Sequence, residues 1–130
     1  RVFFAPFTDT PRHLGRVKHA NLFLDSFPYG AHTTASDAVF SGVPILARSG
    51  EGFQSRVSHS IIHHAGLPEM FATTWEEFNQ KAIEFHQTYD QKKRQKIEKI
   101  LLDKDRDRHP YNINWTTRQI EKAYSAMLAQ

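Results

Sequence analysis

The chain contains no cysteine, so neither disulfide bonds nor thiolate metal ligands contribute to its stability or its function. It also lacks any apolar run approaching the roughly 20 residues of a membrane-spanning helix, and we expect no membrane span. The absence of cysteine is consistent with a reducing compartment, and we expect a cytoplasmic protein. The ten phenylalanines supply the bulk for the core of one domain or part of one.

A dense concentration of positive charge is missing as well. The formal net charge of +3 permits an acidic or phosphorylated ligand, whereas nucleic-acid binding normally comes with denser basic stripes and interleaved aromatic residues. Basic side chains are most frequent between residues 92 and 108, but aspartates and glutamates interrupt them. Because such a mixture is typical of a solvated helix face, we expect no nucleic-acid partner.

Short apolar segments in the first half of the chain predict β-strands. They cover residues 2–5, 22–24 and 43–47, and a fourth candidate lies at 70–72. The unbroken apolar character of residues 22–24 favours a parallel sheet that is covered on both faces. Helical segments alternate with the first three strands, and this order predicts an α/β fold with a doubly wound sheet.

Helices are predicted from capping residues and apolar periodicity. Thr10 is the expected cap of the first helix with Pro11 at its first position, and Gly42 ends the second. Thr74 and Glu77 have the spacing of a capping box. The predicted helices cover residues 10–20, 34–41, 53–65, 75–87, 90–102 and 115–128.

These elements divide the chain into two parts. Residues 1–72 are expected to form an α/β half-lobe, and the helices of residues 73–130 are expected to pack on it. The opening residues, Arg-Val-Phe-Phe-Ala, look like the interior of a strand, so we expect the chain to be a piece of a longer protein. Strand edges left without neighbours promote pairing between chains, and we therefore expect the piece to self-associate.

The most informative segment is His32-Thr33-Thr34, which lies between a predicted strand and the helix that follows it. Ligands of open parallel sheets bind beyond the carboxyl ends of the strands. A helix start there offers unpaired backbone N–H groups and the positive end of the helix dipole, which suits a phosphate. Asp37, one turn further, could accept hydrogen bonds from ribose hydroxyls. In the alternative interpretation, Thr34 and Asp37 form a capping box that needs no ligand.

The same region carries a family resemblance. The run Leu-Asp-Ser-Phe-Pro-Tyr-Gly-Ala-His-Thr-Thr-Ala-Ser-Asp-Ala at residues 24–38 is followed by Ser-Gly-Val-Pro-Ile at 41–45, Gly-Glu at 50–51 and Ser-Arg-Val at 55–57. Together these motifs resemble the catalytic region of O-linked N-acetylglucosamine transferases, and in particular their bacterial relatives, in which tetratricopeptide repeats often precede the catalytic part. The resemblance is good over residues 1–72 and carries few motifs beyond them.

The resemblance implies a fold and a set of binding residues. The fold would be part of the Rossmann-like C-terminal lobe of a GT-B glycosyltransferase, which holds a UDP-sugar. Thr33 and Thr34 would bind the diphosphate, His32 would lie near the uridine and phosphate, and Asp37 would bind the ribose. His13 and Arg16 match family positions near the nucleotide. A family lysine just before His13 has no counterpart, since Thr10 stands near that position.

The implied reaction is transfer of N-acetylglucosamine from UDP to a Ser or Thr hydroxyl of an acceptor protein, with inversion and without a metal ion. The family's catalytic groups lie on an N-terminal lobe and on the first half of the C-terminal lobe, which are absent from this chain. No catalytic residue is assigned here, and we expect no turnover by the piece alone. The rival interpretation is a non-catalytic nucleotide-binding or scaffold module. A separate metal site at His59 and His63, four residues apart, lacks an obvious third ligand.

Overall fold

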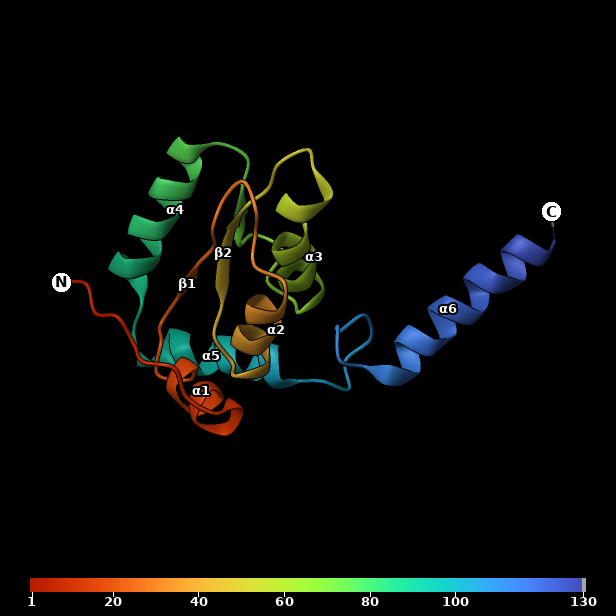
Figure 1. Cartoon of the computed structure of the whole chain (residues 1–130), viewed down its shortest axis with the longest axis horizontal. Helices are drawn as coiled ribbons and strands as arrows, with labels where there is room; N and C mark the ends of the chain where they lie inside the picture. The colour runs from red at the N-terminus through yellow and green to blue at the C-terminus, as the bar shows by residue number, and fades with distance from the viewer. Residues whose placement is uncertain (130) are drawn as a thin grey trace.

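A computed structural model describes residues 1–129 and shows an α/β fold, as predicted. The strands β1 (Phe23–Leu24), β2 (Ile45–Arg48) and β3 (Phe71–Ala72) form a parallel sheet in the order β1-β2-β3. Phe23 pairs with Ile45, and Ala47 pairs with Phe71. The central strand β2 is the most buried of the three, since the side chains of Ile45, Leu46 and Ala47 are fully enclosed. Figure 1 shows the sheet between helices.

Helices α2 (Thr33–Phe40) and α3 (Val57–His64) pack on one face of this sheet, and α4 (Trp75–Thr88) packs on the other. Ile45 and Ala47 face α2 and α3 in the main core, with Val39 and Ile62, whereas Leu46 faces α4 and packs with Phe78. This two-sided burial agrees with the apolar character of the strands. The helices are α1 (Thr10–Val17), α2 (Thr33–Phe40), α3 (Val57–His64), α4 (Trp75–Thr88), α5 (Gln91–Leu102) and α6 (Ile113–Leu128), with a short 3-10 turn, η1 (Phe53–Ser55), before α3.

The predicted strand at residues 2–5 does not form. Residues 1–9 carry no regular secondary structure, and the side chains of Phe3, Phe4 and Phe7 are 85%, 95% and 100% exposed. An isolated extended segment leaves its backbone N–H and C=O groups without partners, so it becomes a strand only where a neighbouring strand is available. Figure 1 shows this red segment running away from the sheet.

Several helix boundaries differ from the prediction because local contacts decide them. Asp9, not Thr10, caps α1 through the N–H of Arg12, and the helix ends at Val17. The predicted helix at 53–65 is divided into η1 and α3. The end of α2 agrees with the prediction, since Gly42 adopts a φ of +78°, which glycine tolerates best. This turn leads directly from α2 into β2.

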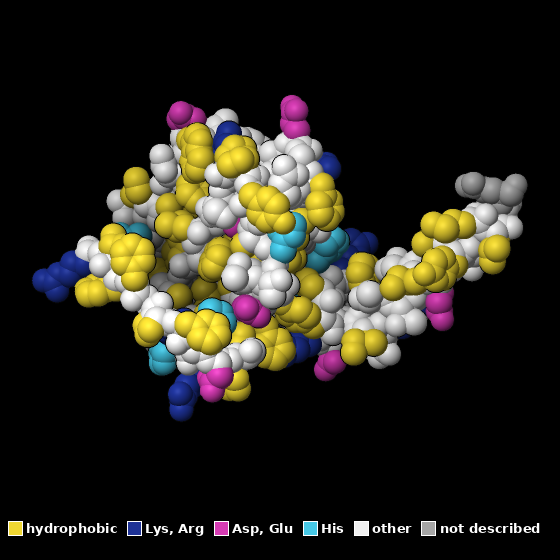
Figure 2. Space-filling view, in the orientation of Figure 1, with side chains coloured by type: hydrophobic (Ala, Val, Ile, Leu, Met, Phe, Trp, Pro, Cys, Tyr) yellow, Lys and Arg dark blue, Asp and Glu magenta, His cyan; other side chains and the backbone are white. Residues whose placement is uncertain are grey.

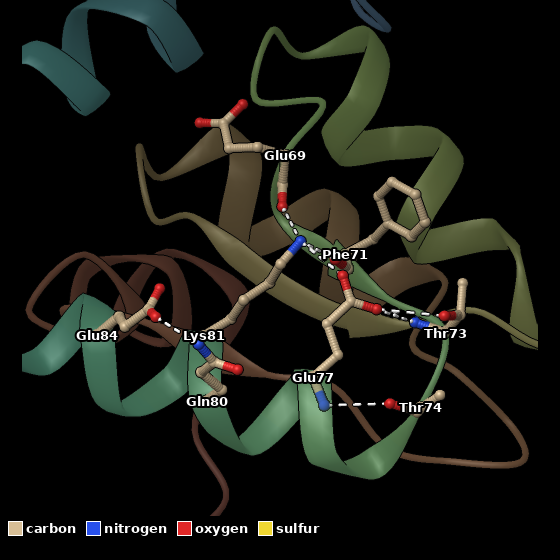
Figure 3. A network of polar contacts seen from close by, with 8 residues as sticks. All are labelled: Glu69, Phe71, Thr73, Thr74, Glu77, Gln80, Lys81 and Glu84. Atoms are coloured by element: carbon tan, nitrogen blue, oxygen red, sulfur yellow. Dashed lines mark hydrogen bonds and ion pairs between the residues drawn. The ribbon is translucent and has the colours of Figure 1, made fainter.

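A polar network joins α4 to β3 (Figure 3). The N–H of Glu77 donates to the Thr74 hydroxyl at 3.1 Å, which caps α4 as predicted. The Glu77 carboxylate reaches back to the N–H of Thr73, one residue earlier than in a standard capping box. The Lys81 ammonium donates to the carbonyl oxygens of Glu69 and Phe71, at 2.9 and 2.6 Å, and pairs with Glu77. The start of α4 and the strand β3 are thereby held together.

The C-terminal helices behave differently from one another. Helices α4 and α5 bury Phe78, Phe85, Ile97 and Leu101. Helix α6 buries none of its described side chains, contrary to the expectation that it packs on the α/β part, and it projects from the body in Figure 1. Figure 2 shows hydrophobic side chains along this helix. None of the helices among residues 1–129 combines the length and apolar character needed to cross a membrane.

Candidate functional site

Helix α2 begins beyond the carboxyl end of β1 with its first turn open to solvent. Thr33 and Thr34 are exposed. His32 occupies the N-cap position, and within the described residues its side chain makes no capping hydrogen bond. Backbone N–H groups in the first turn of a helix have no partner inside the helix, so they are free for an external acceptor. The positive end of the helix dipole adds a preference for an anion.

The predicted capping box of Thr34 and Asp37 is absent. Helix α2 starts at Thr33, so Thr34 lies inside the first turn rather than at the cap. Asp37 turns instead toward α1, where its Oδ2 lies 3.6 Å from Nε2 of His13. The capping box is therefore not formed, and the side chain at the N-cap leaves the first turn of α2 uncapped. Whether this turn binds a ligand stays a prediction.

His13, Arg16 and Asp37 lie together where α1 meets α2. One guanidinium nitrogen of Arg16 lies 3.4 Å from Nδ1 of His13, and the other donates to the carbonyl oxygen of Pro6 at 2.9 Å. A cleft of about 430 Å³ opens between α1 and the preceding segment, and His13 and Arg16 line it. The structure thus brings Asp37 next to His13 and Arg16, which precede it in the sequence by 24 and 21 positions. The group offers basic and acidic side chains to a polar ligand.

His32 belongs to a second, aromatic group on the other side of the first turn. Its ring stacks on Tyr29 with centroids 5.1 Å apart, and it meets Phe53 edge to face at 6.1 Å. Tyr29 and Phe53 are 65% and 73% exposed. Flat exposed rings beside an anion-attracting helix start can hold the base of a nucleotide by stacking. Sequence reasoning missed Tyr29 and Phe53, although Tyr29 lies within the motif and stands only three residues before His32.

Arg48 was also missed by sequence reasoning. It ends β2, and its guanidinium carbon lies 3.8 Å from the ring centroid of Phe27 and 4.8 Å from that of Trp75. Its Nε is buried without a hydrogen-bond partner in the described structure. The two rings hold the cation by cation–π attraction at the carboxyl end of the sheet.

The histidines of α3 lie outside this group. His59 stacks on Phe71 with centroids 3.8 Å apart, and its Nδ1 lies 3.2 Å from the Ser49 hydroxyl. Burial, and next the neighbouring His63, lower the pKa of His59 and of His64. Among residues 1–129, no group of three or more His, Asp or Glu side chains is placed to hold a metal ion.

Comparison with known proteins gives a consistent family assignment. The family model of glycosyl transferase family 41 matches residues 1–120. A UDP-N-acetylglucosamine–peptide N-acetylglucosaminyltransferase of Caenorhabditis elegans is 30% identical over 83 residues, which is 64% of this chain and 7% of that protein. A probable enzyme of the same name from Arabidopsis thaliana, SEC, is 29% identical over 84 residues, or 64% of this chain and 9% of that protein.

The fold has a counterpart among solved structures. A mutant O-GlcNAc transferase of Thermobaculum terrenum superimposes with a TM-score of 0.74 at 26% sequence identity. The match covers 95% of this chain but 23% of the bacterial protein. The chain thus spans less than a tenth of the two curated relatives above and about a quarter of the solved structure.

Proposed function

The chain belongs to glycosyl transferase family 41, and from this premise we propose that it supplies part of the donor site of a larger enzyme. That enzyme transfers N-acetylglucosamine from a UDP-sugar to Ser or Thr hydroxyls of an acceptor protein. The names of the relatives support this donor and this class of acceptor. The observation that carries the proposal is the uncapped, exposed first turn of α2 at Thr33 and Thr34.

In this proposal the first turn of α2 binds the diphosphate of the donor. Backbone N–H groups and the hydroxyls of Thr33 and Thr34 donate hydrogen bonds to the phosphate oxygens. Negative charge grows on the diphosphate as the sugar leaves, so preorganised donors stabilise the transition state more than the ground state. The base that deprotonates the acceptor hydroxyl comes from a part of the enzyme outside this chain.

The flanking groups orient the nucleoside. His32, with Tyr29 and Phe53 beside it, offers aromatic surface to the uracil ring. Asp37 accepts hydrogen bonds from the ribose hydroxyls, and His13 holds its carboxylate in place. Arg16 adds positive charge on the same side. With these cationic groups and the helix N-terminus, the scheme needs no metal ion.

The remaining lobe of the parent protein is the necessary partner of this chain. It supplies the acceptor site and the catalytic groups, and the 130-residue chain alone is expected to be inactive. We place the parent enzyme in the cytoplasm, which is consistent with the absence of cysteine. A bacterial protein with preceding tetratricopeptide repeats fits the resemblance described above and the bacterial solved structure.

Titration of the full-length parent with UDP tests the proposal. Substituting both threonines, Thr33→Ala with Thr34→Ala, is expected to weaken UDP binding about tenfold or more in calorimetry, because two hydroxyl donors to a charged group are lost. Thr116→Ala with Thr117→Ala is the matched control, since this second threonine pair lies on the projecting helix α6. Absence of UDP binding by the unaltered parent would reject the donor site and favour a scaffold.

A further inference from the structure

The loop that carries the α2 start is anchored by a buried carboxylate. Asp25 directly follows β1 and is 8% exposed. Its Oδ1 accepts hydrogen bonds from the N–H of Ser26 at 2.9 Å and from the N–H of Ala31 at 2.7 Å. Its Oδ2 accepts a hydrogen bond from the hydroxyl of Ser58 on α3. Both carboxylate oxygens therefore have partners from the protein itself.

These contacts hold both ends of the loop at residues 26–31 to the carboxylate of Asp25. Ser26 is the first loop residue after Asp25, and Ala31 is the residue before His32, where the N-cap of α2 lies. Burying a carboxylate is costly unless hydrogen bonds compensate for the lost water. Hydrogen bonds compensate this carboxylate, and one of them comes from Ala31, the residue before the N-cap of α2.

The inner side of the loop has no room for adjustment. The N–H of Gly30 donates to the carbonyl oxygen of Gln54 in η1 at 3.0 Å. A Cβ atom at Gly30 would lie 3.0 Å from Asp25 Oδ2 and 3.1 Å from both Gln54 O and Ser58 Oγ. Such distances are tighter than ordinary van der Waals contacts, and all three neighbours are themselves engaged in hydrogen bonds. The loop therefore packs in one arrangement against η1 and α3.

We propose that Asp25 is a positioning residue, which with Ser58 and Gly30 sets the direction of the first turn of α2. Asp25 does not touch the ligand. Its carboxylate holds Ala31, and Ala31 leads directly into His32 and Thr33. The proposal rests on the proposed function, because it assigns to Asp25 the placement of the donors that meet the diphosphate. A small misplacement of such donors weakens binding of the group they face.

The decisive experiment compares two nucleotides on the full-length parent. UDP and UMP share the uridine, but UDP has one more phosphate. In Asp25→Ala, the affinity for UDP is expected to fall about tenfold, and the affinity for UMP by less than about threefold, because the loss concerns the diphosphate donors. Thermal unfolding of each variant is recorded alongside. Phe85→Leu, at a buried position on α4, serves as the control that lowers the melting temperature without changing either affinity.

Two further variants separate position from charge. In Asp25→Asn the amide oxygen still accepts from both backbone N–H groups, and the amide nitrogen can donate to the Ser58 hydroxyl, so the affinity for UDP is expected to stay within about threefold of the unaltered protein. Gly30→Ala keeps the carboxylate but forces the loop outward, and it is expected to reproduce the selective loss of UDP affinity. These two variants also serve if Asp25→Ala fails to fold.

The outcomes distinguish the two proposals. If the unaltered parent binds no UDP, the proposed function fails. If it binds UDP, and Asp25→Ala and Gly30→Ala bind UDP as tightly as it does, the positioning role alone is overturned. The positioning role is equally overturned if UDP and UMP lose affinity to the same extent, in proportion to the fall in melting temperature, because Asp25 would then support only the fold.

Discussion

His109 is a fully buried histidine whose hydrogen bonds require the neutral ring. Its Nε2 lies 3.0 Å from the carbonyl oxygen of Leu101, and its Nδ1 lies 3.2 Å from the N–H of Tyr111. Because the Tyr111 N–H must donate, Nδ1 accepts and the ring proton sits on Nε2. Burial lowers the pKa of His109, against the opposing effect of the hydrogen bond to Leu101.

This lowered pKa predicts a loss of stability in acid. Between the ordinary histidine pKa of about 6.5 and the lower pKa in the folded chain, the unfolded chain binds a proton that the folded chain does not bind. The free energy of unfolding therefore decreases as the pH decreases through this range. Urea unfolding at pH 7.5 and pH 5.5 measures the difference in the free energy of unfolding between the two pH values. His109→Gln is expected to reduce this difference, and His19→Gln, at an exposed position, is expected to leave it unchanged. His59 and His64 act in the same direction, so part of the slope remains. An identical slope in His109→Gln would contradict the assignment.

At the level of single residues, the sequence predicts exposed motif positions better than buried polar ones. The exposed helix start at Thr33 and Thr34 is recognisable because it follows an apolar strand segment, and the binding role of the two threonines stays a prediction. The burial of Asp25 depends on Ser58, which is 33 positions away, and no local pattern indicates that contact. The same holds for Asp37, whose spacing from Thr34 suggests a capping box but whose partner is His13 on another helix.

Among the elements, α4 offers the clearest test of a local stabilising contact. Thr74 caps the helix through the N–H of Glu77 (Figure 3). Thr74→Ala removes the acceptor for that N–H and is expected to lower the free energy of unfolding by about 1 kcal/mol, the usual effect of losing an N-cap. Chemical denaturation measures the change. Asn79→Ala, at an exposed position on the same helix, is the matched control and should change stability by less than about 0.5 kcal/mol. An equal effect of both substitutions would argue against the cap.

Element type was predictable where periodicity is strong, and boundaries were not. The sequence indicates β1, β2 and β3 and the helices between them, because apolar runs and capping residues mark them. The segment at residues 2–5 has the same apolar character, but a strand also requires a partner, which sequence pattern does not supply. The predicted helix at 53–65 is divided near Ser55, which is buried and whose hydroxyl donates to the Gly52 carbonyl oxygen, a contact that apolar periodicity does not indicate.

On the scale of the whole molecule, apolar side chains are exposed at both ends of the described chain. The N-terminal segment exposes Phe4 and Phe7, and α6 exposes Ile120, Tyr124 and Met127. Exposed apolar groups of this kind mark surfaces that associate with other proteins. Many of the exposed apolar side chains lie in these two short segments. We therefore expect the 130-residue chain to self-associate.

Light scattering coupled to size exclusion tests that expectation. At increasing concentration the isolated chain is expected to gain apparent mass, because apolar area is buried between copies. Ile120→Ser with Tyr124→Ser should shift the chain toward monomer, and Lys122→Ser, on the same helix but polar, should not. A monomer at every concentration for the unaltered chain would refute self-association. Thermal unfolding should change little in these variants, since α6 buries no side chain.

Whole-molecule organisation was the least accessible to sequence reasoning. The α/β half was predictable because its segments pack on each other within this chain. The place of α6 was not, since its apolar stripe predicts burial without saying against what.

Helix α2 connects the proposed donor site to helix α5. Its eight residues span about 12 Å, between the open turn at Thr33 and the tight reversal at Gly42. A helix this short does not bend appreciably, so a displacement of one end changes the orientation of the other end. Helix α5 rests on the Gly42 end, where Glu98 and Leu102 lie against the glycine. In the proposed donor site, a shift of α5 against the Gly42 end of α2 would therefore tilt the first turn at Thr33.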